Sequence, residues 1–147
     1  MFSLRVFATA MLVSLWTGGF LFYAAVVVPV GSAMIGKTSQ GFITSQVTIW
    51  LNLFSCLIAV TMLIDLRRRS HLRRFAATFL FACAIPVLWT LHVILTSQME
   101  TSTQSIASPE SFYQIHRAYL LISTLQWGTA VYWILTLGKE ISALRLP

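Results

Sequence analysis

The chain has 147 residues, of which 57% are hydrophobic and only 10% are charged. A soluble domain carries about 25% charged residues, so this composition lacks the polar shell that a soluble domain of this size needs. The formal net charge of +6 therefore has to be read by position before a nucleic-acid partner is considered. We expect a single small integral membrane domain over residues 1–147.

Four long apolar runs predict the secondary structure, at residues 4–30, 42–66, 75–97 and 112–138. Each exceeds the ~20 residues that an α-helix needs to cross about 30 Å of hydrocarbon. Membrane strands would need only about 10 residues and would alternate polar with apolar side chains, and these runs do neither. The sequence predicts an all-α membrane protein, an antiparallel bundle of four transmembrane helices with short connections at 31–41, 67–74 and 97–111.

The orientation follows from the basic residues. Eight of the ten Lys and Arg residues fall on one side of the predicted hairpins. The positive-inside rule then places both termini in the cytoplasm, which suggests a bacterial inner membrane, and it explains the charge without nucleic acid. The loop between the second and third runs is either a topology determinant on lipid headgroups or an anionic-lipid site. Its basic residues are Arg67, Arg68, Arg69, Arg73 and Arg74.

Small and polar residues recur at helical spacing within the runs. In the first run, Ala10, Ser14 and Gly18 form a small-residue ridge of the kind that lets membrane helices approach closely. Because polar groups facing lipid lack partners, we expect the polar stripes to converge on the bundle interior. The stripes are Ser45, Thr48, Asn52, Ser55 and Ala59 in the second run, Trp89, His92 and Thr96 in the third, and His116, Tyr119, Ser123, Gln126 and Ala130 in the fourth.

Asn52, the only asparagine of the chain, lies near the middle of the second run. An unsatisfied amide in hydrocarbon costs several kcal/mol. We therefore predict an interhelical hydrogen bond from Asn52 to Ser123 or Gln126 of the fourth run.

His92 and His116 are expected at equal depth, about five residues or roughly 7 Å inside the outer boundary. Imidazoles are strong iron ligands, and bundle interiors commonly hold cofactors, so axial ligation of a b-type haem is one hypothesis. The other is a structural polar cluster in which the two histidines face each other and bond to neighbours such as Tyr113 and Arg117. The structural reading needs no cofactor, and we predict none.

Other chemistry has less support in the sequence. A divalent metal site would add Glu100 or Glu110 to the two histidines, but no ligand pair has helical i,i+3 or i,i+4 spacing. The only aspartate, Asp65, is expected at the opposite end from both histidines, which excludes a Ser-His-Asp triad. Cys56 and Cys83 are expected at similar depth, either as reduced thiols or as a redox pair.

Two segments carry a resemblance to a known family. The sequence WTGGFLFYAAVVVP at residues 16–29 and the tripeptide Ile115-His116-Arg117 resemble the first and last helices of small four-helix membrane proteins of the transmembrane-protein-205 type, a domain of unknown function. The resemblance covers the first and last quarters of the chain. It implies the four-helix architecture and no established activity.

The absence of a catalytic motif and the close-packing ridge together favour a non-enzymatic membrane protein. We expect it to act by association, as an accessory or structural subunit of a larger complex or as a homo-oligomer. Its expected partners are membrane lipids and other membrane subunits or itself. The alternatives are a haem b electron carrier using His92 and His116, and a small transporter or channel.

Overall fold

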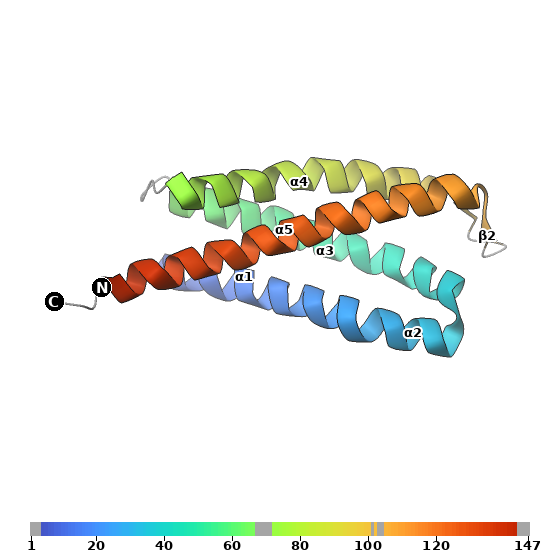
Figure 1. The fold of residues 1–147 in the computed structure, drawn as a ribbon, viewed down its shortest axis with the longest axis horizontal. Helices are drawn as coiled ribbons and strands as arrows, with labels where there is room; N and C mark the ends of the chain where they lie inside the picture. The colour runs from blue at the N-terminus through green and yellow to red at the C-terminus, as the bar shows by residue number, and fades with distance from the viewer. Residues whose placement is uncertain (1–3, 67–71, 101, 103–104, 144–147) are drawn as a thin grey trace.

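The computed structural model describes residues 4–66, 72–100, 102 and 105–143, with the backbone alone over 140–143 (Figure 1). Its elements are helical except for one two-stranded ribbon. In chain order they are α1 (Leu4–Phe22), the π-helical turn η1 (Tyr23–Val27), α2 (Val28–Ile35), α3 (Lys37–Leu66), α4 (Leu72–Ser97), β1 (Met99–Glu100), β2 (Ser105–Ile106) and α5 (Pro109–Ala143).

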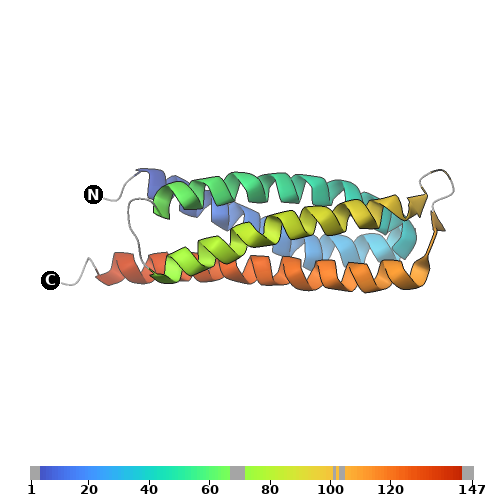
Figure 2. The same ribbon diagram turned by 90° about the horizontal axis from the view of Figure 1, so that it is seen from above.

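The prediction of four long apolar helices is confirmed, because four helical stretches have the length and hydropathy to cross a membrane. α1, η1 and α2 form the first of them without interruption. The four helices lie side by side (Figures 1 and 2), with α1 in contact with α3 and α5, and α4 in contact with the same two helices. The start of α1, the end of α3, the start of α4 and the end of α5 lie together at one end of the molecule.

The first connection is much shorter than the predicted 31–41. α2 continues to Ile35 and α3 begins at Lys37, so Gly36 alone makes the turn. Gly36 has φ 87° and ψ 155°, a conformation that only glycine adopts without strain. A Cβ at Gly31 would overlap the side-chain amide of Gln40, so this buried amide packs directly against α2 at Gly31.

The first helical stretch widens into a π turn just before its proline. Pro29 has no backbone N–H, and its ring would clash with the carbonyl one turn earlier in a regular α-helix. The wider turn accommodates this residue: the Val28 N–H bonds to the Tyr23 carbonyl, five residues back. The Tyr23 hydroxyl donates to Thr44 Oγ1 at 3.1 Å, which ties η1 to α3.

The connection between α4 and α5 contains regular structure that the sequence did not predict. β1 and β2 pair antiparallel, with Met99 opposite Ile106, and the Ala107 N–H bonds to the Gln98 carbonyl at 3.0 Å. α5 then begins at Pro109, three residues before the predicted run, and proline suits the first turn of a helix.

The core combines three large aromatic side chains with smaller apolar residues. Trp16 of α1 packs edge-on against Phe81 of α4, with ring centroids 5.4 Å apart. Trp133 of α5 is 1% exposed, and aliphatic residues of α1 and α3 fill the space around these rings. The buried cluster is Val6, Val13, Trp16, Ile58, Ala59, Met62, Ala77, Phe81, Ala130, Trp133 and Leu137.

Candidate functional site

The polar stripes of α3 and α5 point into the bundle. On α3, the stripe residues Thr48, Asn52 and Ser55 are buried, and on α5, Ser123 and Gln126 are buried. The interior therefore carries hydroxyls and carboxamides from two helices that occupy different positions around the bundle. We call these five residues the polar interior, and they are the candidates for a binding site inside the bundle.

The small-residue ridge of α1 points the other way. Ser14 and Gly18 are exposed, and a Cβ built at Gly18 meets no heavy atom within 4 Å. α1 packs against the bundle through a different face, which includes Thr9, Val13 and Trp16. Ala10 of the ridge is half-buried against the core cluster, whereas Ser14 and Gly18 lie on the outer surface of the molecule.

Asn52 makes an interhelical contact, but its partner is not one of the two predicted residues. The Tyr119 hydroxyl donates to Asn52 Oδ1 at 3.4 Å, and Thr48 interacts with the same hydroxyl. The Ser123 hydroxyl donates to the Leu120 carbonyl of its own helix at 3.0 Å, because a short serine side chain is readily satisfied locally. Asn52 Nδ2 is buried and has no acceptor in the described part of the chain.

Gln126, the other predicted partner, bonds to α4 instead. Its Nε2 donates to the Phe81 carbonyl at 3.3 Å. Pro86 cannot supply the helical N–H that the Ala82 carbonyl would normally accept, so Gln126 meets the α4 backbone next to a weakened point. The stripe identified Gln126 as inward-facing, whereas its partner is a backbone carbonyl of another helix.

Two tryptophans add interhelical bonds that the sequence reading missed. Trp16 Nε1 donates to the Leu51 carbonyl of α3 at 3.2 Å, and Trp127 Nε1 donates to the Thr17 carbonyl of α1 at 3.0 Å. A buried indole N–H needs an acceptor, and here each finds one on a neighbouring helix. Trp127 directly follows Gln126 at the edge of the α5 stripe, which is the only sequence signal for its role.

The two histidines occupy different surroundings. His92 is 6% exposed and has the edge of the Trp89 ring against it, with centroids 6.3 Å apart. His116 is half-buried and stacks on Phe112, with centroids 6.0 Å apart and an interplanar angle of 7°. Each of these aromatic contacts therefore comes from the histidine's own helix.

Tyr113 and Arg117, the predicted neighbours of these histidines, lie on the outer surface of α5. Tyr113 is 54% exposed and Arg117 is exposed, so neither joins the buried polar interior with Asn52, Ser123 and Gln126. Over the described residues, no three side chains of His, Cys, Asp or Glu come together in a group that could hold a metal ion.

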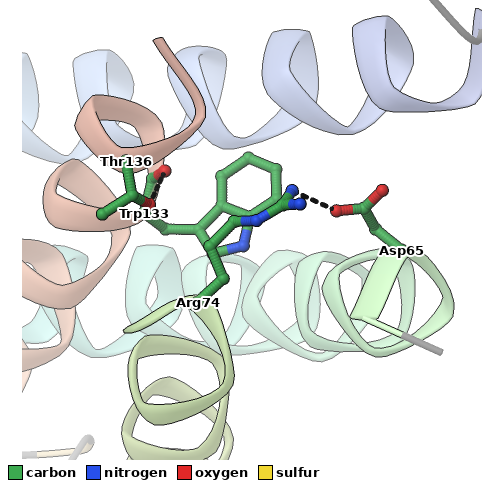
Figure 3. Close-up of polar contacts among 4 residues, drawn as sticks. All are labelled: Asp65, Arg74, Trp133 and Thr136. Atoms are coloured by element: carbon green, nitrogen blue, oxygen red, sulfur yellow. Dashed lines mark hydrogen bonds and ion pairs between the residues drawn. The ribbon is translucent and has the colours of Figure 1, made fainter. Parts of the chain in front are cut away.

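The largest correction concerns Arg74, which was expected on the lipid headgroups. It is 1% exposed, and its Nη1 donates to Asp65 Oδ2 at 2.7 Å. Asp65 is 10% exposed. Figure 3 shows Arg74 of α4 extending between Asp65 of α3 and Trp133 of α5. The carboxylate one helix away compensates the guanidinium charge, so Arg74 can point inward where a lone arginine could not.

The remaining members of the basic loop differ from Arg74. Arg73, its neighbour on the first turn of α4, is exposed, and Arg67, Arg68 and Arg69 lie outside the described residues. Two adjacent arginines therefore have opposite environments.

Cys56 and Cys83 are both free thiols, the first half-buried and the second exposed.

The comparisons with known proteins give no relative: no protein-family model, curated protein or solved structure matches this chain.

Proposed function

We propose that this chain is a multi-pass membrane protein that works by association, with a second copy of itself or as an accessory subunit of a larger membrane complex. Its four helices cross the bilayer as an antiparallel bundle, with both termini and the basic loop in the cytoplasm of a bacterial cell. The excess of Lys and Arg on one side supports this orientation. The resemblance of its first and last helices to the transmembrane-protein-205 type supports the architecture.

The observation that carries this proposal is the outward-facing ridge of α1. Ser14 and Gly18 are exposed one helical turn apart, and neither Gly18 nor Gly19 has a neighbour within 4 Å of a built Cβ. The same helix is the least enclosed of the four. In the 18-residue apolar segment of Leu4–Ile35 only 17% of the residues are buried, against 28% to 33% in the corresponding segments of the other three helices.

Membrane helices associate through close backbone contact at small residues, because lipid supplies no hydrophobic force between them. Ala10 of the ridge packs against the core of its own bundle, but Ser14 and Gly18 are exposed. These two residues are therefore available to a helix of another molecule, and that helix would approach α1 along them.

The test substitutes leucine at Gly18 and, as a matched control, at Gly128 of α5. Both glycines are exposed, and neither has a heavy atom within 4 Å of a built Cβ, so the single chain tolerates either change. The proposal expects wild type and Gly128→Leu to form the same complex, and Gly18→Leu to lose it. Light scattering of the detergent-purified proteins measures self-association, and co-purification under identical conditions measures a heterologous partner.

A disulfide cross-link places the contact in the membrane itself. In a background with Cys56 and Cys83 replaced by alanine, Ser14→Cys is expected to cross-link in native membranes if the partner is a second copy. Thr124→Cys, on an exposed position of α5, is the control and is expected not to. Equal behaviour of Gly18→Leu and Gly128→Leu in both association assays would contradict the proposal.

Haem ligation by His92 and His116 is the second candidate. One observation favours it: neither imidazole makes a hydrogen bond to a residue in the described part of the chain, which leaves ring nitrogens for a ligand. To hold one iron, both rings would have to direct a nitrogen at the same metal. A Soret band in the absorption spectrum of the purified protein would show that haem is bound. Electron transfer would then take the place of association as the proposed function.

A further inference from the structure

The side-chain amide of Asn52 is in an unusual position for a membrane bundle. The residue lies halfway along α3 and is 4% exposed. Its Oδ1 accepts the Tyr119 hydroxyl, while its Nδ2 is buried and has no acceptor among the described residues. An amide N–H without an acceptor in an apolar medium costs several kcal/mol, so the native protein has reason to supply one.

Other polar side chains near Asn52 bond to backbone carbonyls of α3. The Leu51 carbonyl already accepts both Ser55 Oγ at 2.9 Å and Trp16 Nε1 at 3.2 Å. The Thr44 carbonyl accepts Thr48 Oγ1 at 2.7 Å. The corresponding local acceptors for Asn52 are the Ile49 and Thr48 carbonyls, three and four residues back, and its Nδ2 bonds to neither of them.

Gln126 provides the matched comparison. It carries the same carboxamide group, is 3% exposed, and donates through Nε2 to the Phe81 carbonyl at 3.3 Å. The bundle thus satisfies one buried amide with protein and leaves the other, Asn52 Nδ2, pointing at no protein oxygen. The difference is specific to the Asn52 position and is not a general property of amides in this interior.

The acceptor that fits here is neutral. An anion would need a buried positive charge, and among the described residues the only buried cation is Arg74, which is paired with Asp65. This ion pair is also distant from Asn52, because Asp65 lies thirteen residues further along α3, which is about 20 Å at 1.5 Å per residue. A cation would be repelled by the N–H donors of the amide, so a neutral oxygen remains.

We propose that Asn52 and Tyr119 form a binding site for a neutral oxygen acceptor inside the bundle. The shared chemistry is an oxygen that accepts from Asn52 Nδ2, supplied by a water molecule or by the carbonyl of a membrane-soluble compound. Thr48 and the phenolic oxygen of Tyr119 lie beside the amide and give the ligand further polar partners, of which a buried water typically uses about three. The site goes beyond association and does not depend on it.

Solid-state NMR can test the site directly because Asn52 is the only asparagine. Selective ¹⁵N-asparagine labelling of the full chain in lipid bilayers gives a single Nδ2 signal. Transfer of magnetisation from water to that signal is expected if the ligand is water. If it is a membrane-soluble carbonyl compound, no water transfer is seen, but the Nδ2 chemical shift moves after the protein is stripped of lipid-soluble compounds and reconstituted in synthetic lipid.

The Gln126 amide is the control, labelled through glutamine and recognised by its loss in Gln126→Leu. It is expected to show neither water transfer nor a shift on stripping. Tyr119→Phe is expected to change the Asn52 signal and to leave that of Gln126 in place. The proposal is overturned if Asn52 Nδ2 behaves like Gln126, with no contact to water and no response to stripping.

Discussion

Removing the carboxylate beside Arg74 is expected to destabilise the bundle strongly. In Asp65→Asn the guanidinium, 1% exposed, stays inside with a neutral partner in place of the 2.7 Å ion pair. Breaking a buried ion pair by neutralising one partner costs about 3–5 kcal/mol. Arg73→Met is the matched control, since the neighbouring arginine is exposed and exposed substitutions change stability by roughly 0.5 kcal/mol or less.

Reversible unfolding in mixed detergent micelles, followed by tryptophan fluorescence, gives the free energy of unfolding of each variant. The double variant Asp65→Leu/Arg74→Met is expected to recover most of the loss, because it leaves no charge buried. The reasoning fails if Asp65→Asn costs less than about 1 kcal/mol, the level of an exposed pair. It also fails if Arg73→Met and Arg74→Met cost the same.

Two further predictions use the same unfolding assay. Gly31→Ala is expected to lower the free energy of unfolding by about 1–3 kcal/mol, because its Cβ overlaps the buried Gln40 amide. Gly41→Ala, which has open space around its Cβ, is expected to raise it by roughly 0.5–1 kcal/mol. Equal effects of the two substitutions would contradict the contact between Gly31 and Gln40. Gln126→Leu is expected to lose about 0.6 kcal/mol and at most ~1.7 kcal/mol, while exposed Gln114→Leu on the same helix stays neutral; no difference between them would contradict the bond to α4.

Hydropathy predicts the four helices but not where they end. Hydropathy detects only the apolar part of a helix. The predicted run 4–30 therefore ends, and the run 42–66 begins, at the polar residues between them. The helices themselves continue to Ile35 and start at Lys37, because serine, threonine and lysine can remain helical outside the apolar run. Only the positive φ of Gly36 interrupts them, and a single glycine carries no such information in sequence.

The polar stripes predict which face of α3 and α5 turns inward, but not the contacts that the side chains make. Asn52 meets Tyr119, one helical turn from Ser123, because the serine hydroxyl is already satisfied by its own helix. A stripe gives the direction of a side chain around its helix, while a partner depends on how two helices are displaced along their axes.

Small residues and charges are ambiguous for a related reason. The ridge of Ser14 and Gly18 has the same spacing whether it packs inside its own bundle or faces another molecule, and the structure places it outside. Arg73 and Arg74 contribute equally to the charge asymmetry, yet only Arg74 is turned toward Asp65. Which of two such residues faces a neighbouring helix depends on how its own helix is rotated about its axis, and the packing of the bundle sets that rotation.

The proposed four-span arrangement with both termini in the cytoplasm is tested most directly by cysteine labelling in intact cells. In a background without Cys56 and Cys83, Ser102→Cys follows β1 in the connection between α4 and α5, and Leu72→Cys lies at the start of α4; both positions are exposed. A membrane-impermeant maleimide is expected to label position 102 in intact cells and position 72 only after the membrane is permeabilised. Labelling of position 72 in intact cells, with position 102 protected, would contradict the account.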